Sequence, residues 1–516
     1  MPVTRLSEKA VLLRPGDDVA VARELIAPTA LALDDGSELN LAGAIRPGHK
    51  FALRDIPADV PVRKYGQTIG FATDDITAGS HVHVHNVSVR DFERDYRFAA
   101  EATPLEPYPA SHMRFFDGYA RPDGGVGTRN YIAVISTVNC SASVSSYVAR
   151  EFDEAALTGY SNVDGVLAIT HKGGCGTNLG GADYVQLQRT LAGFARHPNI
   201  FGYVLMGLGC EVNQIVDLVH NHGLLRIDAI RQPPKTISIQ AEGGTRKAID
   251  AGIRAVQEML PAANECVRTP QPVSKLTIGA ECGGSDANSG ITANPAVGVC
   301  GDELVRYGGT HCIAETTEMY GAEHLLTARA VSEEVGKKLV GRIRWWENYA
   351  TTHGAEIDNN PTPGNKEGGL TTIYEKSLGA IAKGGTSPLT AVYEFAEPMT
   401  EPGFVVMDTP GYDPVSVTGM VAGGANVVLF TTGRGSVFGF KPVPSIKIAT
   451  NSRLYHHMID DMDINAGDAV EGGSVQDVGM AIFEDVIAVA SGKQTKSEIA
   501  GVGELEFCPW VLGPIL

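Results

Sequence analysis

The sequence predicts an α/β protein with mostly parallel sheets, preceded by a small all-β domain at its N-terminus. Two observations support this prediction. Between residues of about 10 and 90, short strand-like runs such as VAVAREL and HKFALRDI alternate with turns that contain glycine or proline. Further along, β-branched apolar runs such as YIAVIS alternate with helical patterns such as YVQLQRTLAGFARH. This second alternation is typical of βα units, whose strands pair in parallel.

Changes in composition divide the chain into four segments. Residues 1–95 are predicted to form the all-β domain, and a polar, aromatic and proline-containing stretch over residues 96–125 is predicted to be a linker. The βα pattern then fills a middle α/β domain, residues 126–268, and a C-terminal α/β domain, residues 269–516. Both α/β segments are long enough to bury a hydrophobic core of their own.

The acidic composition restricts the class of partner. With 60 acidic against 42 basic residues, the net charge of −18 would repel nucleic acid and anionic membrane surfaces, so a small molecule is the expected partner. No apolar run approaches the roughly 20 residues that span a bilayer, and the first residues lack the apolar core of a signal peptide. We therefore expect a cytoplasmic protein without a nucleic-acid or membrane partner, and a homo-oligomer is a common state for large enzymes.

Four of the eight cysteines follow strand-like runs. Cys140, Cys175, Cys210 and Cys282 each come after an apolar stretch and small residues, as in GYVLMGLGC. Because parallel sheets bind ligands beyond the carboxyl ends of their strands, these thiols are expected to converge on one crevice and to bind iron, zinc or an iron–sulfur cluster. The alternative is that each cysteine fills a small buried corner, which is a common role of this residue type.

The run HVHVHN places histidines at alternate positions of a strand-like segment. Alternate residues of a strand face the same side, so His81, His83 and His85 would share one face. Neutral imidazoles there can ligate a metal ion or act as acid or base, whereas the alternative is a solvated edge rich in histidine. We expect His83 and His85 to face the active site.

Polar residues cluster in glycine-rich turns towards the C-terminus. Such turns can ligate a divalent cation or bind hydroxyl groups, although acidic and amide residues also simply build turns. The acidic and amide residues of this kind are Glu281, Asp286, Asn288, Asn294, Glu315, Glu318 and Glu323. Lys366 and Arg434 also lie in glycine-rich turns, and Arg129 lies in the similar GVGTRN, so each cation either holds an anion or is solvated.

Read together, these stretches resemble the altronate and galactarate dehydratase family of sugar-acid hydro-lyases. The matching stretches run in order along nearly the whole chain: GHKFALRDI, KYGQTIG, HVHVHN, GTRNYIAVISTVNC, RHPN, GLGCE, ECGGSDANSGITANP, PGNKEGGLTT, TTGRG, IKIATNS and DINAG. The resemblance implies an N-terminal SAF domain with a β-clip fold followed by an α/β body. It also implies a divalent metal, typically iron, and a product that is a 2-keto-3-deoxy sugar acid.

Two features of the sequence bear on the substrate. HVHVHN resembles altronate dehydratases rather than galactarate dehydratases, whereas MDTPGYDPVSVTG differs from altronate enzymes and Asp18 stands where the family often has asparagine. The substrate is therefore expected to be an altronate-like aldonate or a galactarate-like aldarate. Sulfolactate sulfo-lyases are built from a similar SAF domain and body, so loss of sulfite is an alternative reaction. A non-catalytic protein that binds a sugar acid is another alternative.

The chemistry that the resemblance implies assigns roles to these residues. Dehydration removes a weakly acidic proton next to a carboxylate, so the developing negative charge needs a Lewis acid or a cation. We therefore expect Fe²⁺, another divalent ion such as Mn²⁺, or an iron–sulfur cluster on Cys140, Cys175, Cys210 and Cys282. The expected catalytic residues are His83, His85, Lys366 and Glu315. The expected substrate contacts are His49, Lys50, Arg129, Asp286, Asn365 and Arg434.

Overall fold

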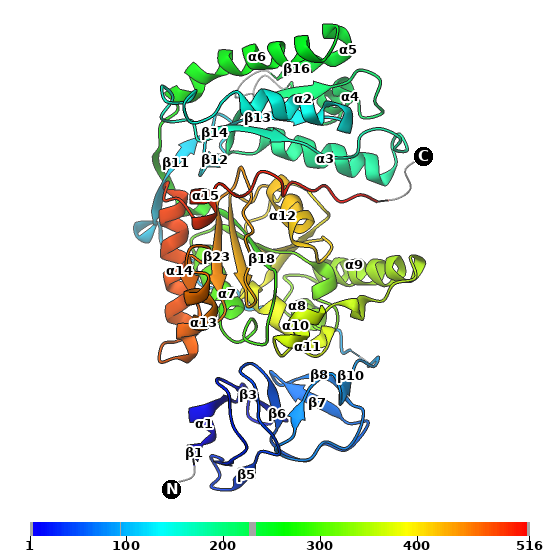
Figure 1. Cartoon of the computed structure of the whole chain (residues 1–516), viewed down its shortest axis with the longest axis vertical. Coiled ribbons are helices and arrows are strands. Elements are labelled where there is room, and N and C mark those ends of the chain that lie inside the picture. Colours follow the sequence, from blue (N-terminus) through cyan, green and yellow to red (C-terminus); the bar gives the residue numbers. More distant parts are fainter. Residues whose placement is uncertain (1–3, 93, 226–233, 513–516) are drawn as a thin grey trace.

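Three parts are stacked along the long axis of the molecule (Figure 1). The computed structural model describes residues 4–92, 94–225 and 234–512. The N-terminal β-module lies at one end, the C-terminal α/β domain lies in the centre, and the middle α/β domain lies at the other end. The last domain in the sequence is therefore the one that contacts both of the others.

The N-terminal β-module contains short strands and one helical turn, α1 (Leu6–Lys9). Its sheets have the orders β1-β4-β5, β2-β3-β6-β9 and β10-β8-β7, and every pair except β1 with β4 is antiparallel. The strands are β1 (Thr4–Arg5), β2 (Ala10–Val11), β3 (Val19–Ala22), β4 (Ala30–Ala32), β5 (Glu38–Asn40), β6 (Lys50–Ala52), β7 (Pro61–Lys64), β8 (Gln67–Ala72), β9 (His81–Val82) and β10 (Val87–Ser88). Residues such as Leu31, Ile45 and Phe51 form its core. The predicted all-β domain is confirmed.

A small ribbon joins the two α/β domains. Its central strand, β11 (Phe115–Ala120), lies inside the segment that was expected to be a linker. It pairs antiparallel with β12 (Val126–Gly127), at the start of the middle domain, and with β17 (Thr269–Pro272), at the start of the C-terminal domain. Backbone hydrogen bonds therefore tie the two domains together at this point.

The middle domain is built on a four-stranded parallel sheet with the order β14-β13-β15-β16. The strands are β13 (Tyr131–Ser136), β14 (Gly165–Ile169), β15 (Ile200–Gly207) and β16 (Lys235–Ser238). The helices are α2 (Asn139–Arg150), α3 (Ala182–Arg196), α4 (Ile215–Asn221), α5 (Ile239–Glu242) and α6 (Thr245–Glu265). Helices α2 and α6 pack on one face and α3 on the other, so β15 is buried along its whole length.

The C-terminal domain is built on a seven-stranded parallel sheet with the order β20-β21-β19-β18-β22-β23-β24. The strands are β18 (Thr277–Cys282), β19 (Thr310–Ile313), β20 (Leu389–Tyr393), β21 (Gly403–Met407), β22 (Val427–Thr432), β23 (Ser445–Ala449) and β24 (Ile464–Asn465). The helices are α7 (Ala293–Arg306), α8 (Glu323–Ala328), α9 (Glu333–Thr352), α10 (Pro363–Glu367), α11 (Ile373–Ile381), α12 (Asp413–Ala422), α13 (Ser452–His457), α14 (Val475–Ala490) and α15 (Lys496–Ile499). The predicted parallel α/β body is confirmed.

The two faces of the large sheet have different neighbours. Helices α7 and α14 cover one face, and α12 covers the other. Helix α12 also packs on α3 of the middle domain, where Gly193 is required because a Cβ atom would collide with the Ala422 carbonyl. One hydrophobic cluster therefore spans both α/β domains.

The strand order of the large sheet reverses beside β18. From β18 the chain passes to β19 on one side, and after β21 it crosses to β22 on the other side. In doubly wound sheets, ligands bind outside the carboxyl ends of the strands at such a switch point. The loops that follow β18 and β22 therefore border the expected binding crevice.

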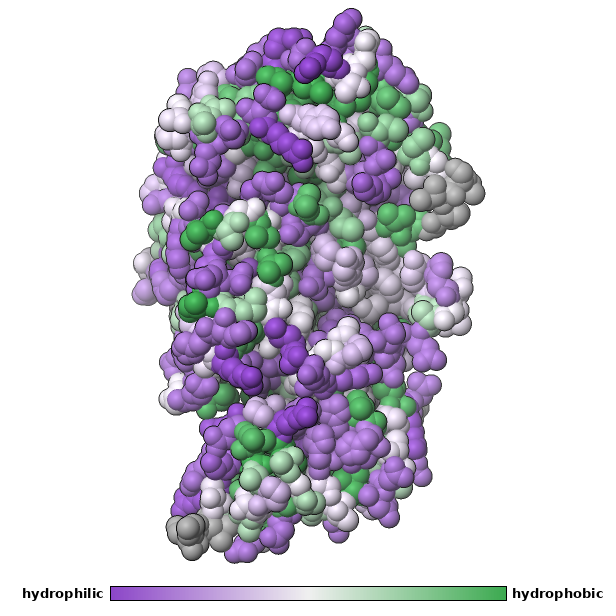
Figure 2. Space-filling model, in the orientation of Figure 1, coloured by the Kyte–Doolittle hydropathy of each residue, from purple (hydrophilic) through white to green (hydrophobic). Residues whose placement is uncertain are grey.

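Figure 2 shows that polar residues cover most of this face of the molecule, with apolar residues scattered among them. Within the described part of the chain, none of the helices combines the length and the apolar character needed to cross a bilayer.

Candidate active site

The β-module is seated on the connection between β19 and β20. Lys50 Nζ donates a hydrogen bond to the Gly369 carbonyl at 2.7 Å, and the Thr372 hydroxyl donates one to the Ile69 carbonyl. Gly369, with φ +99°, makes the closest backbone approach, because a Cβ atom there would collide with the Gly48 carbonyl. At this point the two domains meet backbone against backbone, without room for a Cβ atom on Gly369.

Three buried charges hold this junction. Glu375 Oε2 lies 2.9 Å from Lys50 Nζ, and Glu375 Oε1 lies 2.8 Å from Lys64 Nζ, with all three side chains at most 1% exposed. Thr371 donates to the same carboxylate through its hydroxyl and its backbone N–H. Burial opposes ionisation, but the two ammonium groups outweigh it and lower the pKa of Glu375. Lys50, expected as a substrate contact, is instead buried and paired, which gives it a structural role.

Four histidines of the β-module gather where it faces the body, and we call them the histidine quartet: His49, His81, His83 and His85. Neighbouring rings lie 5.0–5.5 Å apart between centroids. His49 joins the run because β6 pairs antiparallel with β9. Burial lowers the pKa of His83 to about 4, and burial together with the neighbouring imidazoles lowers the pKa of His81 to about 4. Both rings are therefore neutral near pH 7.

The end of α10 lies directly against the quartet. His83 Nε2 lies 2.8 Å from the Lys366 carbonyl oxygen, and His49 Nε2 lies 3.1 Å from the Glu367 carbonyl oxygen. On the solvent side, Arg434 Nη2 lies 3.0 Å from Glu367 Oε2, and both of these side chains are exposed. The structure therefore brings five of the predicted site residues to one place: the side chains of His49, His83, His85 and Arg434 and the backbone of Lys366.

Asp286 and Asn365 support α10 from behind. The Asn365 side chain caps α10 and donates to the Ser285 carbonyl at 2.8 Å. Asp286 accepts hydrogen bonds from the Thr450 hydroxyl at 3.0 Å and from the Ser289 backbone at 2.9 Å. Burial raises the pKa of Asp286, although these donors oppose the shift. Both side chains are largely engaged by the protein, so they position the junction rather than line its open side.

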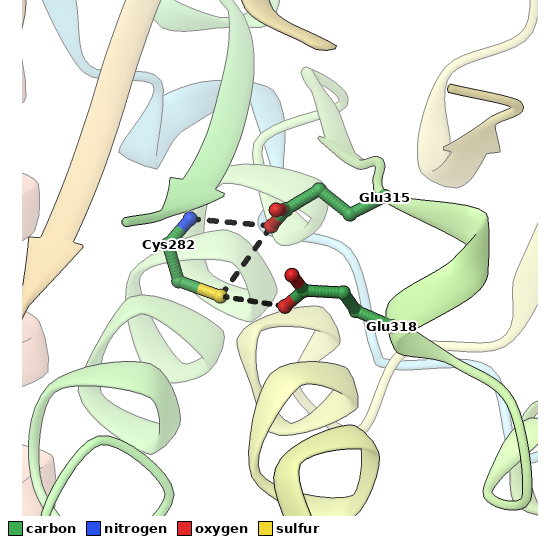
Figure 3. A group of neighbouring side chains, drawn as sticks. All are labelled: Cys282, Glu315 and Glu318. Atoms are coloured by element: carbon green, nitrogen blue, oxygen red, sulfur yellow. Dashed lines mark hydrogen bonds between the residues drawn. The ribbon is translucent and has the colours of Figure 1, made fainter. Parts of the chain in front are cut away.

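A second group, which we call the acid cluster, lies at the carboxyl ends of β18 and β19 and comprises Glu281, Cys282, Glu315, Glu318 and Asp413. Figure 3 shows Glu315 and Glu318 pointing from one segment towards Cys282 at the end of β18. Cys282 Sγ lies 3.4 Å from Glu315 Oε2 and 3.8 Å from Glu318 Oε2.

Two buried lysines neutralise part of the acid cluster. Lys383 Nζ lies 2.9 Å from both Cys282 Sγ and Glu315 Oε2. Lys376 Nζ lies 2.6 Å from Glu318 Oε1. The thiol side of the cluster therefore already has a cation beside it.

The other side of the acid cluster has the features of a cation site. Glu281 Oε1 and Glu315 Oε1 are buried without a hydrogen-bond partner among the described residues, and ligand atoms of Glu281, Glu315 and Asp413 lie within 4.8 Å of one another. Burial and the Glu315 carboxylate raise the pKa of Glu281 well above its usual value and that of Asp413 to about 7. A divalent ion would relieve this repulsion, and oxygen-rich sets suit such ions. The donor set therefore fits a divalent metal.

The backbone at Glu315 is held in an unusual conformation. Its φ of 67° and ψ of 59° place it in the left-handed region, which costs free energy for a residue with a Cβ atom. The Thr409 hydroxyl accepts a hydrogen bond from its backbone N–H at 2.8 Å and helps to hold the conformation. This turn directs the Glu315 carboxylate back towards the end of β18.

The acid cluster and the junction share a small cavity. Tyr65 of the β-module, Cys282, Asp286 and Lys376 line it, and its volume of about 10 Å³ is room for about one water molecule. The β-module therefore closes the carboxyl edge of the large sheet directly above the acid cluster.

The remaining predicted thiols lie in the other sheet. Cys140, Cys175 and Cys210 follow β13, β14 and β15 of the middle domain and are exposed, whereas Cys282 is buried in the C-terminal domain. The first three loops do adjoin, because the Asn139 N–H donates to the Gly173 carbonyl and the next loop residues are similarly bonded. Among the described residues, none of these three thiols belongs to a group of three close ligand atoms. The four cysteines therefore do not form a single set.

Arg129 also lies away from this junction. All five of its guanidinium N–H groups have protein acceptors: the Glu498 carboxylate and the carbonyls of Thr128, Val489 and Lys493. No donor is left for a substrate carboxylate, so the expected substrate contact is replaced by a link between the middle domain and the end of the chain.

Several residues of the site gave little or no signal in the sequence. Lys64, Glu375 and Lys383 are distant from one another in the chain and lie in ordinary strand or helix contexts. Only the ionisable character of Lys64 within the stretch KYG hinted at a role. Because a buried charge needs a partner, only the fold reveals that these residues are paired.

Three family profiles cover most of the chain. The altronate/galactarate dehydratase SAF domain matches residues 8–90, the second domain of D-galactarate dehydratase/altronate hydrolase matches residues 118–264, and the C-terminal D-galactarate/altronate dehydratase domain matches residues 273–515. They correspond to the β-module and to the two α/β domains described above.

Named relatives match over similar lengths. The galactarate dehydratase (L-threo-forming) of Escherichia coli K12 is 39% identical over 88% of this chain and 88% of its own length. The altronate dehydratase of the same organism is 35% identical over 93% of this chain and 95% of its own length. The (2R)-sulfolactate sulfo-lyase of Chromohalobacter salexigens matches through two subunits, the beta subunit at 31% identity over 75% of this chain and the alpha subunit at 36% over 69 residues. The chain belongs to the altronate/galactarate dehydratase family, and this membership makes it a hydro-lyase.

Proposed function

We propose that the chain dehydrates a sugar acid, an altronate-like aldonate or a galactarate-like aldarate, to the 2-keto-3-deoxy sugar acid, and that the reaction takes place at the junction of the β-module with the large sheet. The observation that supports this most is the match to dehydratases over 88% and 93% of the chain. The family models match both sides of the junction, residues 8–90 and 273–515. The switch point of the large sheet lies at the same place.

The open side of the junction carries the groups that such a substrate requires. The exposed Arg434 guanidinium supplies positive charge for the carboxylate and can bind it through two parallel hydrogen bonds, and Lys366, whose backbone carbonyl contacts His83, is the second cation that we assign to the substrate. The imidazoles of His83 and His85 supply acid–base groups beside them. His49, Asp286 and Asn365 hold these side chains and α10 in place.

We also propose that a divalent metal, Fe²⁺ or Mn²⁺, is held by Glu281, Glu315 and Asp413. The buried oxygens of Glu281 and Glu315 that lack a partner among the described residues support this assignment. Such an ion would supply Lewis-acid stabilisation of negative charge on the substrate. Cys140, Cys175 and Cys210 stay the predicted alternative place for a metal or an iron–sulfur cluster, and Cys282 belongs to the acid cluster.

The proposal is tested by product formation under reducing conditions. Protein loaded with Fe²⁺ is incubated with altronate, galactarate and other aldonates and aldarates, and the 2-keto-3-deoxy product is measured. Arg434→Gln is expected to raise KM for the acid that reacts, because it removes a contact with the carboxylate, while Lys337→Gln, on the exposed face of α9, leaves KM unchanged. Absence of product from every sugar acid would contradict the proposal. The expected homo-oligomeric state is checked on the same sample by light scattering.

Loss of sulfite is the second candidate reaction. It is favoured by the beta subunit of the sulfolactate sulfo-lyase, of whose length this chain covers 95%. Incubation with sulfolactate distinguishes the two reactions, because release of sulfite supports the second and formation of a keto acid from a sugar acid without sulfite supports the first.

A further inference from the structure

The hydrogen bonds of the histidine quartet fix where its protons lie. A carbonyl oxygen can only accept a hydrogen bond, so His49 Nε2, which lies 3.1 Å from the Glu367 carbonyl oxygen, carries the hydrogen. The same argument places a hydrogen on His83 Nε2, which lies 2.8 Å from the Lys366 carbonyl oxygen. Burial lowers the pKa of both imidazoles, so each is neutral and has only this one N–H.

The tautomer of His49 determines that of His81. Because His49 carries its hydrogen on Nε2, its Nδ1 has a lone pair and can only accept a hydrogen bond. His81 Nε2 lies 3.0 Å from this Nδ1. His81 Nε2 must therefore donate this hydrogen bond, which leaves the neutral ring of His81 with a lone pair on Nδ1. Within residues 4–92, 94–225 and 234–512, no group donates a hydrogen bond to this nitrogen.

We propose that His81 is the catalytic base, which takes the proton from the carbon next to the substrate carboxylate, and that His49 is the residue that positions it. The inference rests on the proposed function and adds to it a residue and a tautomer. The chain from the Glu367 carbonyl to His49 and then to His81 ends in one free lone pair at the edge of the junction.

The other two members of the quartet are less suited to this step. No described residue donates a hydrogen bond to His83 Nδ1 either, but this side chain is buried, with the rings of His49 and His81 packed against it. The exposed His85 ring stacks on His81 at 5.5 Å, and no hydrogen bond in the described part of the chain fixes its orientation. His81 is the member that is both oriented by a hydrogen bond and partly open to solvent.

The step balances without any other reactant. The C2 proton moves to His81 Nδ1, and the electron pair of the C2–H bond forms the C2=C3 double bond as the C3–O bond breaks. The departing hydroxide takes up the proton held on His81 and leaves as water, and the resulting enol becomes the ketone. His81 therefore returns to its neutral form in each turnover.

Burial, together with the neighbouring imidazoles and Lys50, keeps His81 neutral before the substrate arrives. The titratable and charged groups around the quartet are Arg46 and Lys50 of the β-module, Glu375 on α11, Lys366 and Glu367 on α10, and Arg434 after β22. Positive charge disfavours a protonated imidazole, whereas the anionic sugar acid favours one once it binds. Binding of the substrate therefore raises the basicity of His81 when the proton must be accepted.

His81→Gln tests the assignment, because the glutamine amide can still donate to His49 but has no basic nitrogen. We expect kcat to fall by about 10²- to 10⁴-fold with KM changed only a few-fold. His112→Gln, an exposed histidine of the short helix before β11, should keep wild-type kcat. His49→Phe, which removes the acceptor for His81, should lower kcat less than His81→Gln does. Wild-type kcat in His81→Gln would overturn the inference.

A measurement that does not depend on turnover separates this inference from the proposed function. Long-range ¹H–¹⁵N spectra of the full chain with ¹⁵N-labelled histidine report the tautomer of each ring. We expect His49 and His81 to be neutral with the hydrogen on Nε2 near pH 7, and His49→Phe to remove this preference from His81. A hydrogen on His81 Nδ1 would overturn the inference, even if the wild-type protein dehydrates a sugar acid. Failure of the wild-type protein to dehydrate any acid would instead overturn the proposed function, and the catalytic role of His81 with it.

Discussion

The two parallel sheets carry reactive side chains at the same kind of position but in different surroundings. At the carboxyl edge of the middle sheet, Cys140 in the first turn of α2 and Cys175 and Cys210 on loops after their strands are exposed. At the carboxyl edge of the large sheet, Glu281 and Glu315 are buried, and the β-module covers that edge. On the covered side, burial and neighbouring carboxylates raise the pKa of Glu281 well above its usual value and that of Asp413 to about 7, because both effects disfavour the charged form. The end of a strand brings a side chain to the edge where ligands bind. Burial of that edge under another domain then changes the acidity of the side chain.

The largest expected effect is on the contact that provides this cover. Glu375→Ala leaves the ammonium groups of Lys50 and Lys64 buried without a partner, so we expect the free energy of unfolding to fall by about 3–5 kcal/mol. Urea denaturation measures it, and Glu258→Ala, which breaks the exposed pair with Lys235, should cause little change. Equal losses in the two variants would mean that the junction is not held by its buried charges.

The next effect is on the acid cluster. Glu315→Gln removes a charge from the proposed metal site and should lower both the content of bound metal and kcat, the latter by about 10²- to 10³-fold. Glu333→Gln, on the exposed start of α9, is the matched control. Metal analysis and turnover assays report the two quantities separately. Full metal content in Glu315→Gln and in Glu281→Gln would show that these carboxylates do not bind the metal.

A smaller effect concerns pH. The pKa values of His81 and His83 are lowered from 6.5 to about 4, so between these values the unfolded chain binds protons that the folded chain does not. The free energy of unfolding should therefore fall as the pH is lowered from 6.5 towards 4. Above pH 6.5 both imidazoles are neutral in the folded and the unfolded chain, so this loss of stability is absent there. Thermal unfolding of the wild-type protein and of His81→Gln/His83→Gln measures it. The variant should show the shallower dependence, and identical slopes would contradict the neutral state of these rings.

The smallest effect is expected at the exposed edge. Because the three thiols of the middle domain do not form a close ligand group, Cys140→Ser/Cys175→Ser/Cys210→Ser should keep its metal content and its kcat within about twofold. Loss of iron or of acid-labile sulfide from this variant would contradict the view that only the covered edge binds a metal. It would support the prediction that these cysteines bind a metal or a cluster.

Local patterns in the sequence located the elements well. The alternation of short strands with turns gave the β-module, and the βα pattern gave two parallel sheets. The strand-end rule also placed Cys140, Cys175 and Cys210 correctly beyond three strands. The same rule wrongly grouped Cys282 with these three thiols, because no local pattern tells which strands share a sheet. Cys282 ends β18, which belongs to the large sheet of the C-terminal domain.

The candidate site was predicted less completely because its contacts are long-range. The alternation of HVHVHN suggested a common face, yet β9 covers only His81 and Val82, and the rings gather because the chain turns directly afterwards. Lys50 was expected to bind substrate because its partner Glu375, 325 residues away in the sequence, could not be inferred. Asp413 escaped notice for the same reason, since only folding brings it to Glu281 and Glu315.

The buried triad of Lys50, Lys64 and Glu375 has a consequence for how this protein could be divided. In the Chromohalobacter salexigens sulfo-lyase, two polypeptides match what this chain carries in one. Here the chain between the β-module and β11 is the covalent tether, and it is itself bonded to the C-terminal domain through the Arg94–Glu323 ion pair and the backbone N–H groups of Ala99 and Tyr108. The triad and these contacts together form the joint. A proteolytic nick within this tether should therefore leave two fragments that copurify, and strong salt should separate them slowly because the ion pairs are shielded from counterions.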